Sequence, residues 1–279
     1  MGASGGFIIF RMHQITSSIN SGIPEEYGSL TYSTIDQAIE VIQTYGRNCQ
    51  LIKRDFASAF RHIPVSPLNI PLLGFHWNAR YYAQRFLLFG FRTAPYLFNL
   101  FAEVFHGILE RQFELIALRA QVIHYFDDVL IVCSGPEDPT QSASLFTTLS
   151  SQVEVGIKVA KNEQGCVASF GGVELDTGKM IVRLPLKKLE KARTIVRTAI
   201  EKHSLLLLEI QKITSYLNFV AVVVPLGQTF LRHLYNMKLY FPSRGISYRR
   251  RILQEARRDL TWWSKVLANS PERSIMPRE

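Results

Sequence analysis

The sequence predicts an α+β fold over its first part and a helical region after it. Up to about residue 183, short β-prone runs alternate with amphipathic runs of helical spacing. From Pro185 onward the pattern is helical and basic almost to the end. The apolar fraction of 47% in 279 residues is enough for a sizeable core. We therefore expect a mixed α+β region and an all-α region, with a boundary at 183–186.

The elements of the first part follow from apolar spacing and from turn residues. Thr34 is a candidate cap for the first helix, and Asn78 and Ala79 lie near the turn of the first hairpin. Thr93 and Pro95 mark the start of the longest helix, because threonine caps helices and proline fits their first turn. In chain order we expect a helix over 32–45, a strand over 49–56, a helical turn ended by Pro64, a hairpin over 72–90, and a helix after Thr93 with the apolar face Leu97, Phe98, Phe101, Phe105, Ile108 and Leu109.

A second hairpin is expected over residues 122–133, "VIHYFDDVLIVC", with its turn at Asp127 and Asp128. The remaining elements of the first part are a strand-like run at 6–12, a helix over 141–155 and two short strands around Gly171 and Gly172.

The chain is strongly basic, with a formal net charge of +9. This charge favours a polyanionic partner, either nucleic acid or an anionic membrane surface, although a basic enzyme without such a partner has the same composition. The cysteines Cys49, Cys133 and Cys166 form no C-x-x-C pair, which favours free thiols in a reducing compartment. The start lacks a secretory pattern, and the apolar run at 219–224 is far shorter than the roughly 18 residues of a spanning helix. We therefore expect an intracellular protein, cytoplasmic or nuclear, with no membrane partner.

Asp127 and Asp128 interrupt the most strand-like segment of the chain. Aspartate is a common turn residue, so a plain turn is one explanation of the pair. However, the chain has only seven aspartates, and Asp55 also follows a strand-like run. If the two strands are neighbours in one sheet, their carboxylates converge and repel until a proton or a cation relieves the repulsion. Since Mg²⁺ prefers oxygen ligands, the pattern predicts a magnesium site.

Five segments, in order, resemble the motifs of reverse transcriptases. They are "DFASAF" at 55–60 with the "IPV" that follows, "FGFRTAP" at 89–95, "YFDD" at 125–128, "GIKVAKNE" at 156–163 and "FGGVELDTGKM" at 170–180. Downstream, residues 213–235 and 256–267 are similar to the thumb and connecting region of tyrosine-recombinase retrotransposon polymerases of the DIRS group. The resemblance covers roughly residues 7–268.

The resemblance implies a right-hand polymerase with an antiparallel palm sheet, partial fingers and an all-α thumb. It implies partial fingers at 1–50, a palm at 51–183 with an inserted fingers segment at about 65–90, a helical thumb at 184–240, and a connection helix and tail at 241–279. An RNase H domain normally follows in the family, but the remaining acidic residues cannot supply its active site, so we expect no RNase H activity. The implied activity is that of an RNA-directed DNA polymerase from a retroelement. It would transfer a nucleotide from a dNTP to a DNA primer on an RNA or DNA template.

The resemblance also implies roles for individual residues. Asp55 and Asp127 would bind two Mg²⁺ ions, with Mn²⁺ as a possible substitute, and Asp128 would lie close by as a weaker ligand. The carbonyl of Phe56 would complete one of the metal sites. Lys161 would protonate the leaving pyrophosphate, although most lysines are merely solvated.

Substrate-binding residues are implied as well. Arg11 would contact the triphosphate, and Phe60 would be a steric gate against the ribose 2′-hydroxyl, unless it is an ordinary core aromatic. Phe89 would border the incoming sugar. The template and nucleotide floor would consist of Gly90, Thr93, Ala94 and Pro95, which a tight turn before a helix also explains.

Two further groups would hold nucleic acid. The primer grip would be Phe170, Gly171, Gly172 and Val173, for which a Gly-rich turn is the alternative. Backbone phosphates would meet a basic helix, for which a solvated face is the alternative, through Lys187, Lys188, Lys191, Arg193 and Arg197.

Departures from the family pattern leave other functions open. Leu88 stands where the family usually has proline, and Gly171 replaces the usual leucine. An RNA-dependent RNA polymerase shares the palm, but the bulky Phe60 opposes ribonucleotides. An inactive remnant that binds nucleic acid without extending it is favoured by the uncharged "GASGG" at 2–6 and opposed by the intact aspartates.

Overall fold

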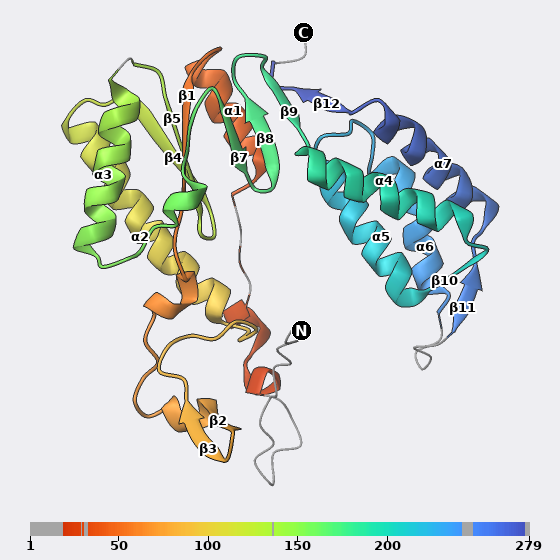
Figure 1. Cartoon of the computed structure of the whole chain (residues 1–279), viewed down its shortest axis with the longest axis horizontal. Helices are drawn as coiled ribbons and strands as arrows, with labels where there is room; N and C mark the ends of the chain where they lie inside the picture. Colours follow the sequence, from red (N-terminus) through yellow and green to blue (C-terminus); the bar gives the residue numbers. More distant parts are fainter. Residues whose placement is uncertain (1–18, 29, 31–32, 136, 242–247, 277–279) are drawn as a thin grey trace. The chain divides into compact units, whose positions relative to one another are not determined.

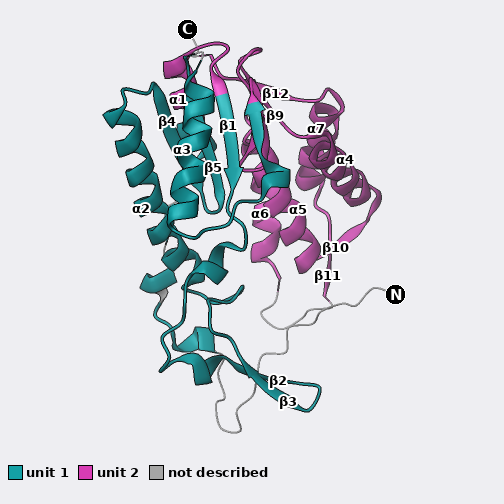
Figure 2. Ribbon diagram, turned by 60° about the vertical axis from the view of Figure 1, so that its left-hand side comes forward, with its two compact units in different colours: residues 1–37, 51–164 teal, residues 38–50, 165–279 magenta. Residues whose placement is uncertain are grey.

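The computed structural model describes residues 19–28, 30, 33–135, 137–241 and 248–276. The chain divides into two compact units, which Figure 2 distinguishes by colour. The first unit consists of residues 1–37 and 51–164, and the second consists of residues 38–50 and 165–279. The strand-like run at 6–12, which includes Arg11, lies outside the described residues.

A four-stranded sheet lies at the centre of the first unit, in the order β4-β5-β1-β6 (Figure 1). All but the first residue of β1 and of β5 is buried, which explains why the apolar side chains of β5 run on without alternating, whereas β1 also buries Lys53, Arg54 and Asp55. β4 and β5 form an antiparallel hairpin in which Tyr125 pairs with Asp128. The strands are β1 (Gln50–Asp55), β4 (Ala120–Tyr125), β5 (Asp128–Cys133) and β6 (Glu163–Gly165).

Two helices, α2 (Ala94–Leu115) and α3 (Asp138–Gln152), pack on each other and on the β4–β5 hairpin. Aromatic rings fill the core of this unit. The fully buried ring of Phe56 lies with its centroid 5.0 Å from that of Phe105 and 5.6 Å from that of Phe146. The residue after β1 is therefore held by packing on both helices.

A separate hairpin in the same unit consists of β2 (Gly74–Trp77) and β3 (Arg80–Ala83). Its two turn residues, Asn78 and Ala79, have positive φ angles of 48° and 58°. This left-handed conformation matches the twist of a two-residue hairpin turn. Short 3₁₀ turns make up the rest of the unit, at Ile19–Gly22, Glu25–Gly28, Ala59–His62, Ile70–Leu73 and Val159–Lys161.

The second unit combines a small antiparallel sheet, in the order β12-β9-β8-β7, with packed helices. A two-stranded ribbon of β10 and β11 also lies in this unit. The strands are β7 (Val167–Phe170), β8 (Val173–Asp176), β9 (Ile181–Arg183), β10 (Ser204–Leu206), β11 (Arg249–Arg251) and β12 (Glu272–Ser274). The helices are α4 (Leu186–Glu201), α5 (Leu207–Val220), α6 (Arg232–Leu239) and α7 (Gln254–Ala268), with a 3₁₀ turn at Thr229–Leu231.

Most of the expected elements are present. The first helix is α1 (Ile35–Tyr45), and its start is closed by a reciprocal cap between Thr34 and Gln37. The expected strand before Asp55 is β1, and the helix expected after Thr93 is α2. These results confirm an α+β fold. The assignment of fingers, palm and thumb to residue ranges remains a proposal.

Three details of the prediction were wrong. The turn of the second hairpin is Phe126–Asp127, because Asp128 already pairs with Tyr125 inside the ladder. The side chain of Thr93 makes no capping hydrogen bond, although its carbonyl accepts the amide of Leu97 at 3.0 Å. Ile108 is 40% exposed, because it lies beside the apolar stripe of α2 and not within it. No helix among the described residues is long and apolar enough to span a bilayer.

Candidate active site

Three aspartates of the first unit come together where β1 ends and the β4–β5 hairpin turns. β1 and β5 are neighbours in the sheet, so the end of one strand lies beside the start of the other. The backbone amide of Phe56 donates to the carbonyl of Asp127 at 2.9 Å, which joins the two segments directly. Asp55 is buried, whereas Asp127 and Asp128 are half-buried. The structure therefore brings together the three carboxylates that the sequence singled out.

The turn that presents Asp127 is conformationally unusual. Phe126 has a φ of 55°, which a bulky residue rarely adopts. Strained backbone of this kind persists only where the surroundings fix it, and it is common at functional sites. The hydrogen bond from Phe56 and the ladder pair Tyr125–Asp128 supply this restraint.

Three lysines balance the charge of the carboxylates. Lys158 forms ion pairs with both Asp55 and Asp127, at 2.9 Å from Asp127 Oδ2. Lys161 Nζ lies 2.8 Å from Asp55 Oδ2, and Lys53 Nζ lies 3.3 Å from Asp128 Oδ1. The lysine side chains thus hold positive charge between and around the acids.

The surroundings shift the pKa values of Asp55 and Asp128 in opposite directions. Burial by itself raises the pKa of Asp55, but hydrogen bonds from Lys158 and Lys161 outweigh it and hold that pKa below its usual value. Burial raises the pKa of Asp128, and the hydrogen bond and charge of Asp55 raise it further against the opposing charge of Lys53. One carboxyl group is therefore held ionised, while its neighbour takes up a proton more readily.

The donor set of this cluster fits hard divalent cations. It consists of carboxylate oxygens, the ligand type that Mg²⁺ prefers. The ammonium groups of Lys158 and Lys161 both form ion pairs with Asp55. The carboxylate cluster therefore stabilises positive charge at this position.

An aromatic pair lies next to this core. The ring of the half-buried Phe60 packs edge-on against Phe89 at 5.0 Å and against Phe98 at 5.9 Å between centroids. Phe98 in turn contacts the ring of Phe56 at 6.1 Å. Phe89 is 61% exposed, so the pair presents an aromatic surface to solvent.

The predicted floor residues lie at the start of α2. Gly90 has a φ of 86°, and its carbonyl accepts a hydrogen bond from Asn20 Nδ2 at 2.7 Å. Asn20 Oδ1 also accepts the amide of Arg92 at 2.8 Å, so one side chain holds both ends of this loop. Thr93 and Pro95 are half-buried, whereas Ala94 is fully buried, and the role of these residues as a floor remains a prediction.

The hairpin predicted as the primer grip belongs to the second unit. Phe170 pairs with Val173, and both side chains are buried. Gly171 and Gly172 make the two-residue turn with φ angles of 54° and 88°. Lys188 Nζ donates to the carbonyl of Gly172 at 2.8 Å, so α4 supports this turn.

We expect Gly172→Ala to lower the free energy of unfolding by about 1–3 kcal/mol. A Cβ atom at this position would lie 2.3 Å from Lys188 Nζ and 3.2 Å from the ring of Phe219, and the φ of 88° is strained for alanine. Urea unfolding measures the effect. Gly107→Ala is the matched control, because Gly107 lies in α2 with open space around it and should gain roughly 0.5–1 kcal/mol. Equal shifts for both variants would contradict this account.

The basic residues predicted to meet phosphates divide into two groups. Lys187, Lys191 and Arg197 are exposed on α4. The other two have intramolecular partners: Lys188 at Gly172, and Arg193 at the carbonyls of Leu267 and Ala268 at 2.9 and 3.2 Å. Lys188 and Arg193 therefore also support their own fold, and the contact of these cations with phosphates remains a prediction.

Sequence reasoning missed three residues of this region. Lys53 lies two residues before Asp55, and alternate residues of a strand share a face, so the strand period predicts their proximity. Lys158 lies within the "GIKVAKNE" segment but was not singled out there. Asn20 joins its loop across 70 residues of sequence, and no local signal indicates such a contact.

Comparison with known proteins gives a family match. The sequence profile described as "Reverse transcriptase (RNA-dependent DNA polymerase)" matches residues 10–217 of this chain. No protein among the curated sequences matches it.

Solved structures of foamy viral protease-reverse transcriptase have a similar fold. The structure in complex with RNA/DNA hybrid has a TM-score of 0.62 and a sequence identity of 18%. The match covers 88% of this chain and 30% of that chain. A form described as dRH, in complex with double-stranded DNA, has a TM-score of 0.63 and a sequence identity of 15%. The match covers 87% of this chain and 38% of that chain. A third structure, with double-stranded DNA, has a TM-score of 0.58 and a sequence identity of 16%. The match covers 90% of this chain and 48% of that chain. At these identities the likeness shows the fold, and this chain spans less than half of each of these chains.

Proposed function

Because the chain belongs to the reverse transcriptase family, we propose that it catalyses template-directed DNA synthesis. The reaction joins the α-phosphate of a dNTP to the 3′-hydroxyl of a DNA primer on an RNA or DNA template, with pyrophosphate as leaving group. The observation that carries the proposal is the convergence of Asp55, Asp127 and Asp128 at the turn of the β4–β5 hairpin.

The residues at this turn have separate tasks in the proposed reaction. Asp55, Asp127 and the carbonyl of Phe56 would hold two Mg²⁺ ions, with Asp128 close by and Mn²⁺ as a substitute. When bound, such ions supply charge that stabilises the attacking and leaving oxygens. Lys161, now paired with Asp55, is the candidate donor of a proton to pyrophosphate. Lys158 and Lys53 orient the carboxylates through their ion pairs.

Nucleic-acid binding by this chain is supported by charge and by the compared structures. The formal net charge is +9, and exposed cations line α4 at Lys187, Lys191 and Arg197. The foamy viral protein is described in complex with double-stranded DNA and with RNA/DNA hybrid. We propose the same kinds of ligand here, with the Phe170–Val173 hairpin holding the primer. The placement among tyrosine-recombinase retrotransposons remains a proposal that rests on the thumb-like segments.

Primer extension tests the proposed activity. We expect the purified chain to extend a DNA primer on an RNA template with dNTPs and Mg²⁺, to stop on chelation, and to resume when Mg²⁺ is restored. The second candidate function is that of a remnant that binds nucleic acid without extending it. Retained primer-template binding without extension, with Mg²⁺ or with Mn²⁺, would favour that function and contradict the first.

Phe60→Val is expected to raise the use of rNTPs relative to dNTPs by at least roughly tenfold. The half-buried ring would occupy the space of a 2′-hydroxyl, and valine keeps a buried apolar residue while removing the ring. Single-nucleotide incorporation with dNTP and with rNTP measures the ratio. Phe86→Val, also a partly exposed phenylalanine of this unit, should leave the ratio unchanged. An unaltered ratio for Phe60→Val would mean that Phe60 is only a packing residue.

A further inference from the structure

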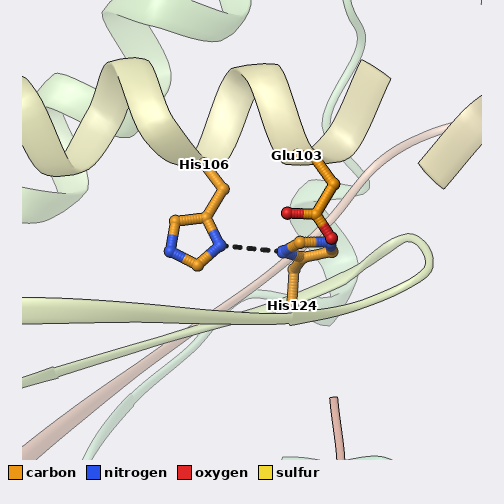
Figure 3. Close-up of side chains that lie close together, drawn as sticks. All are labelled: Glu103, His106 and His124. Carbon is orange, nitrogen blue, oxygen red and sulfur yellow. Dashed lines mark hydrogen bonds and ion pairs between the residues drawn. The ribbon is translucent and has the colours of Figure 1, made fainter. Parts of the chain in front are cut away.

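A second cluster of metal-binding side chains lies where α2 faces β4 (Figure 3). Glu103 and His106 are three residues apart on α2 and therefore share a face, and His124 reaches them from β4. One ligand atom from each of the three lies within 4.8 Å of the others. None of these residues has a task in the proposed reaction.

The cluster has three close contacts, and two neutral imidazoles supply only two N–H groups for them. His106 Nε2 lies 3.1 Å from Glu110 Oε1, and in the tautomer with the proton on Nε2 the Nδ1 atom keeps its lone pair. That Nδ1 lies 2.9 Å from Nδ1 of His124, whose Nε2 lies 3.5 Å from the Glu103 carboxylate. Neutral His124 has one N–H for two acceptors. Whichever acceptor receives it, the other ring nitrogen of His124 directs a lone pair at a second electron-rich atom.

Two kinds of positive charge would resolve this conflict. A proton on the half-buried His106 would satisfy all three contacts, whereas a proton on His124 would place a charge on a residue that is only 4% exposed, which is costly. A metal ion would accept the lone pairs of both rings and the carboxylate together. Imidazole suits ions such as Zn²⁺, whereas Mg²⁺ favours oxygen ligands only.

The surroundings also match those of known metal sites. A histidine that binds a metal usually donates its other N–H to a carboxylate, and Glu110 Oε1 lies 3.1 Å from His106 Nε2. Glu110 Oε1 in turn accepts the amide of Val122 at 3.4 Å, and Asn99 Nδ2 donates to Glu103 at 3.3 Å. The Glu103 side chain is 58% exposed, which leaves a side open for a water ligand.

We propose that Glu103, His106 and His124 bind one divalent transition-metal ion of the Zn²⁺ class, with water as a fourth ligand. Three protein ligands of the His₂Glu type and one open position are a known arrangement for zinc. The two Nδ1 atoms need to separate from 2.9 Å to roughly 3.3 Å for tetrahedral coordination, a change that side-chain rotation supplies.

The ion would fasten α2 to β4, the strand that leads into the turn bearing Asp127. Its effect on the first unit is therefore stabilising, and it adds no group to the reaction. This inference does not depend on the proposed function, because ion binding and thermal stability are measured without substrates.

Co²⁺ titration of the full chain tests the proposal. The protein is stripped with a chelator, and Co²⁺ is added in the presence of millimolar Mg²⁺, which occupies the all-oxygen cluster. We expect one equivalent of Co²⁺ to bind with the visible absorption of a four-coordinate nitrogen and oxygen site, and Zn²⁺ to displace it. Zn²⁺ should also raise the melting temperature by roughly 5 °C.

Three variants and one control make the test decisive. His106→Gln and Glu103→Gln should weaken Co²⁺ binding by at least about tenfold, and Glu110→Gln, which removes the outer carboxylate, by about 10–100-fold. His76→Gln is the control, because His76 lies on the β2–β3 hairpin outside the cluster. All four side chains are half-buried or exposed, so circular dichroism should report folded proteins. Unchanged Co²⁺ binding in His106→Gln, or no stoichiometric binding by the parent chain, would overturn the proposal.

Discussion

Asp127→Asn should lower the rate of primer extension by about 1000-fold or more, while the chain still binds primer-template. Asparagine keeps the shape of the side chain and is accepted in turns, so the β4–β5 hairpin should persist. What is lost is the negative charge that now pairs with Lys158 at 2.9 Å. In the proposed reaction that charge binds Mg²⁺, and an amide is a far weaker ligand.

The measurement is steady-state extension under matched binding conditions. Asp36→Asn is the control, since Asp36 lies in the first turn of α1, away from the three aspartates along the chain. It should keep the rate within about twofold of the parent, because surface changes of this kind have small effects. Extension by Asp127→Asn at the rate of the parent would remove Asp127 from the proposed mechanism.

Phe56→Ala should lower the free energy of unfolding by about 4 kcal/mol, because a fully buried phenylalanine would leave a cavity. The ring is 0% exposed and contacts four other phenylalanines from α2 and α3. These are Phe98, Phe101, Phe105 and Phe146. The backbone of Phe56 also donates to Asp127, so a shift of this residue displaces the catalytic turn.

Urea unfolding and primer extension of the same samples measure both effects. We expect Phe56→Ala to lose extension activity in the folded fraction as well as stability. Phe86→Ala is the control, because Phe86 is 41% exposed and should change the free energy of unfolding by less than about 1 kcal/mol. Equal losses of stability for the two variants would mean that the aromatic cluster does not hold the turn in place.

Elements with a strong local signal could be predicted from the sequence. β5 is a run of β-branched and other apolar residues after Asp128, and α2 has both helical spacing and proline in its first turn. The ribbon of β10 and β11 could not be predicted, because each strand has three residues and depends on its partner. The predicted position of the β4–β5 turn was one residue too late in the chain for a similar reason. Pairing with β4, and not local propensity, decides where β5 begins.

The candidate site was only partly predictable. Asp55, Asp127 and Asp128 were found because carboxylates are rare inside apolar strands. The lysines around them were harder to assign, since lysine is common on surfaces and only Lys53 has a strand-period relation to Asp55. The pairing of His124 with His106 joins a strand to a helix across 18 residues. The Glu-x-x-His spacing at 103–106 was a visible signal, but its partner in space was not.

The lysines between the aspartates have a consequence for how the protein is assembled and handled. Lys158 and Lys161 neutralise Asp55 from within the chain, so repulsion among the acids is already relieved before any ion arrives. In the proposed reaction, folding of the polypeptide and binding of Mg²⁺ are then separate events. Protein prepared with a chelator should be folded but inactive, and it should gain activity when Mg²⁺ is added.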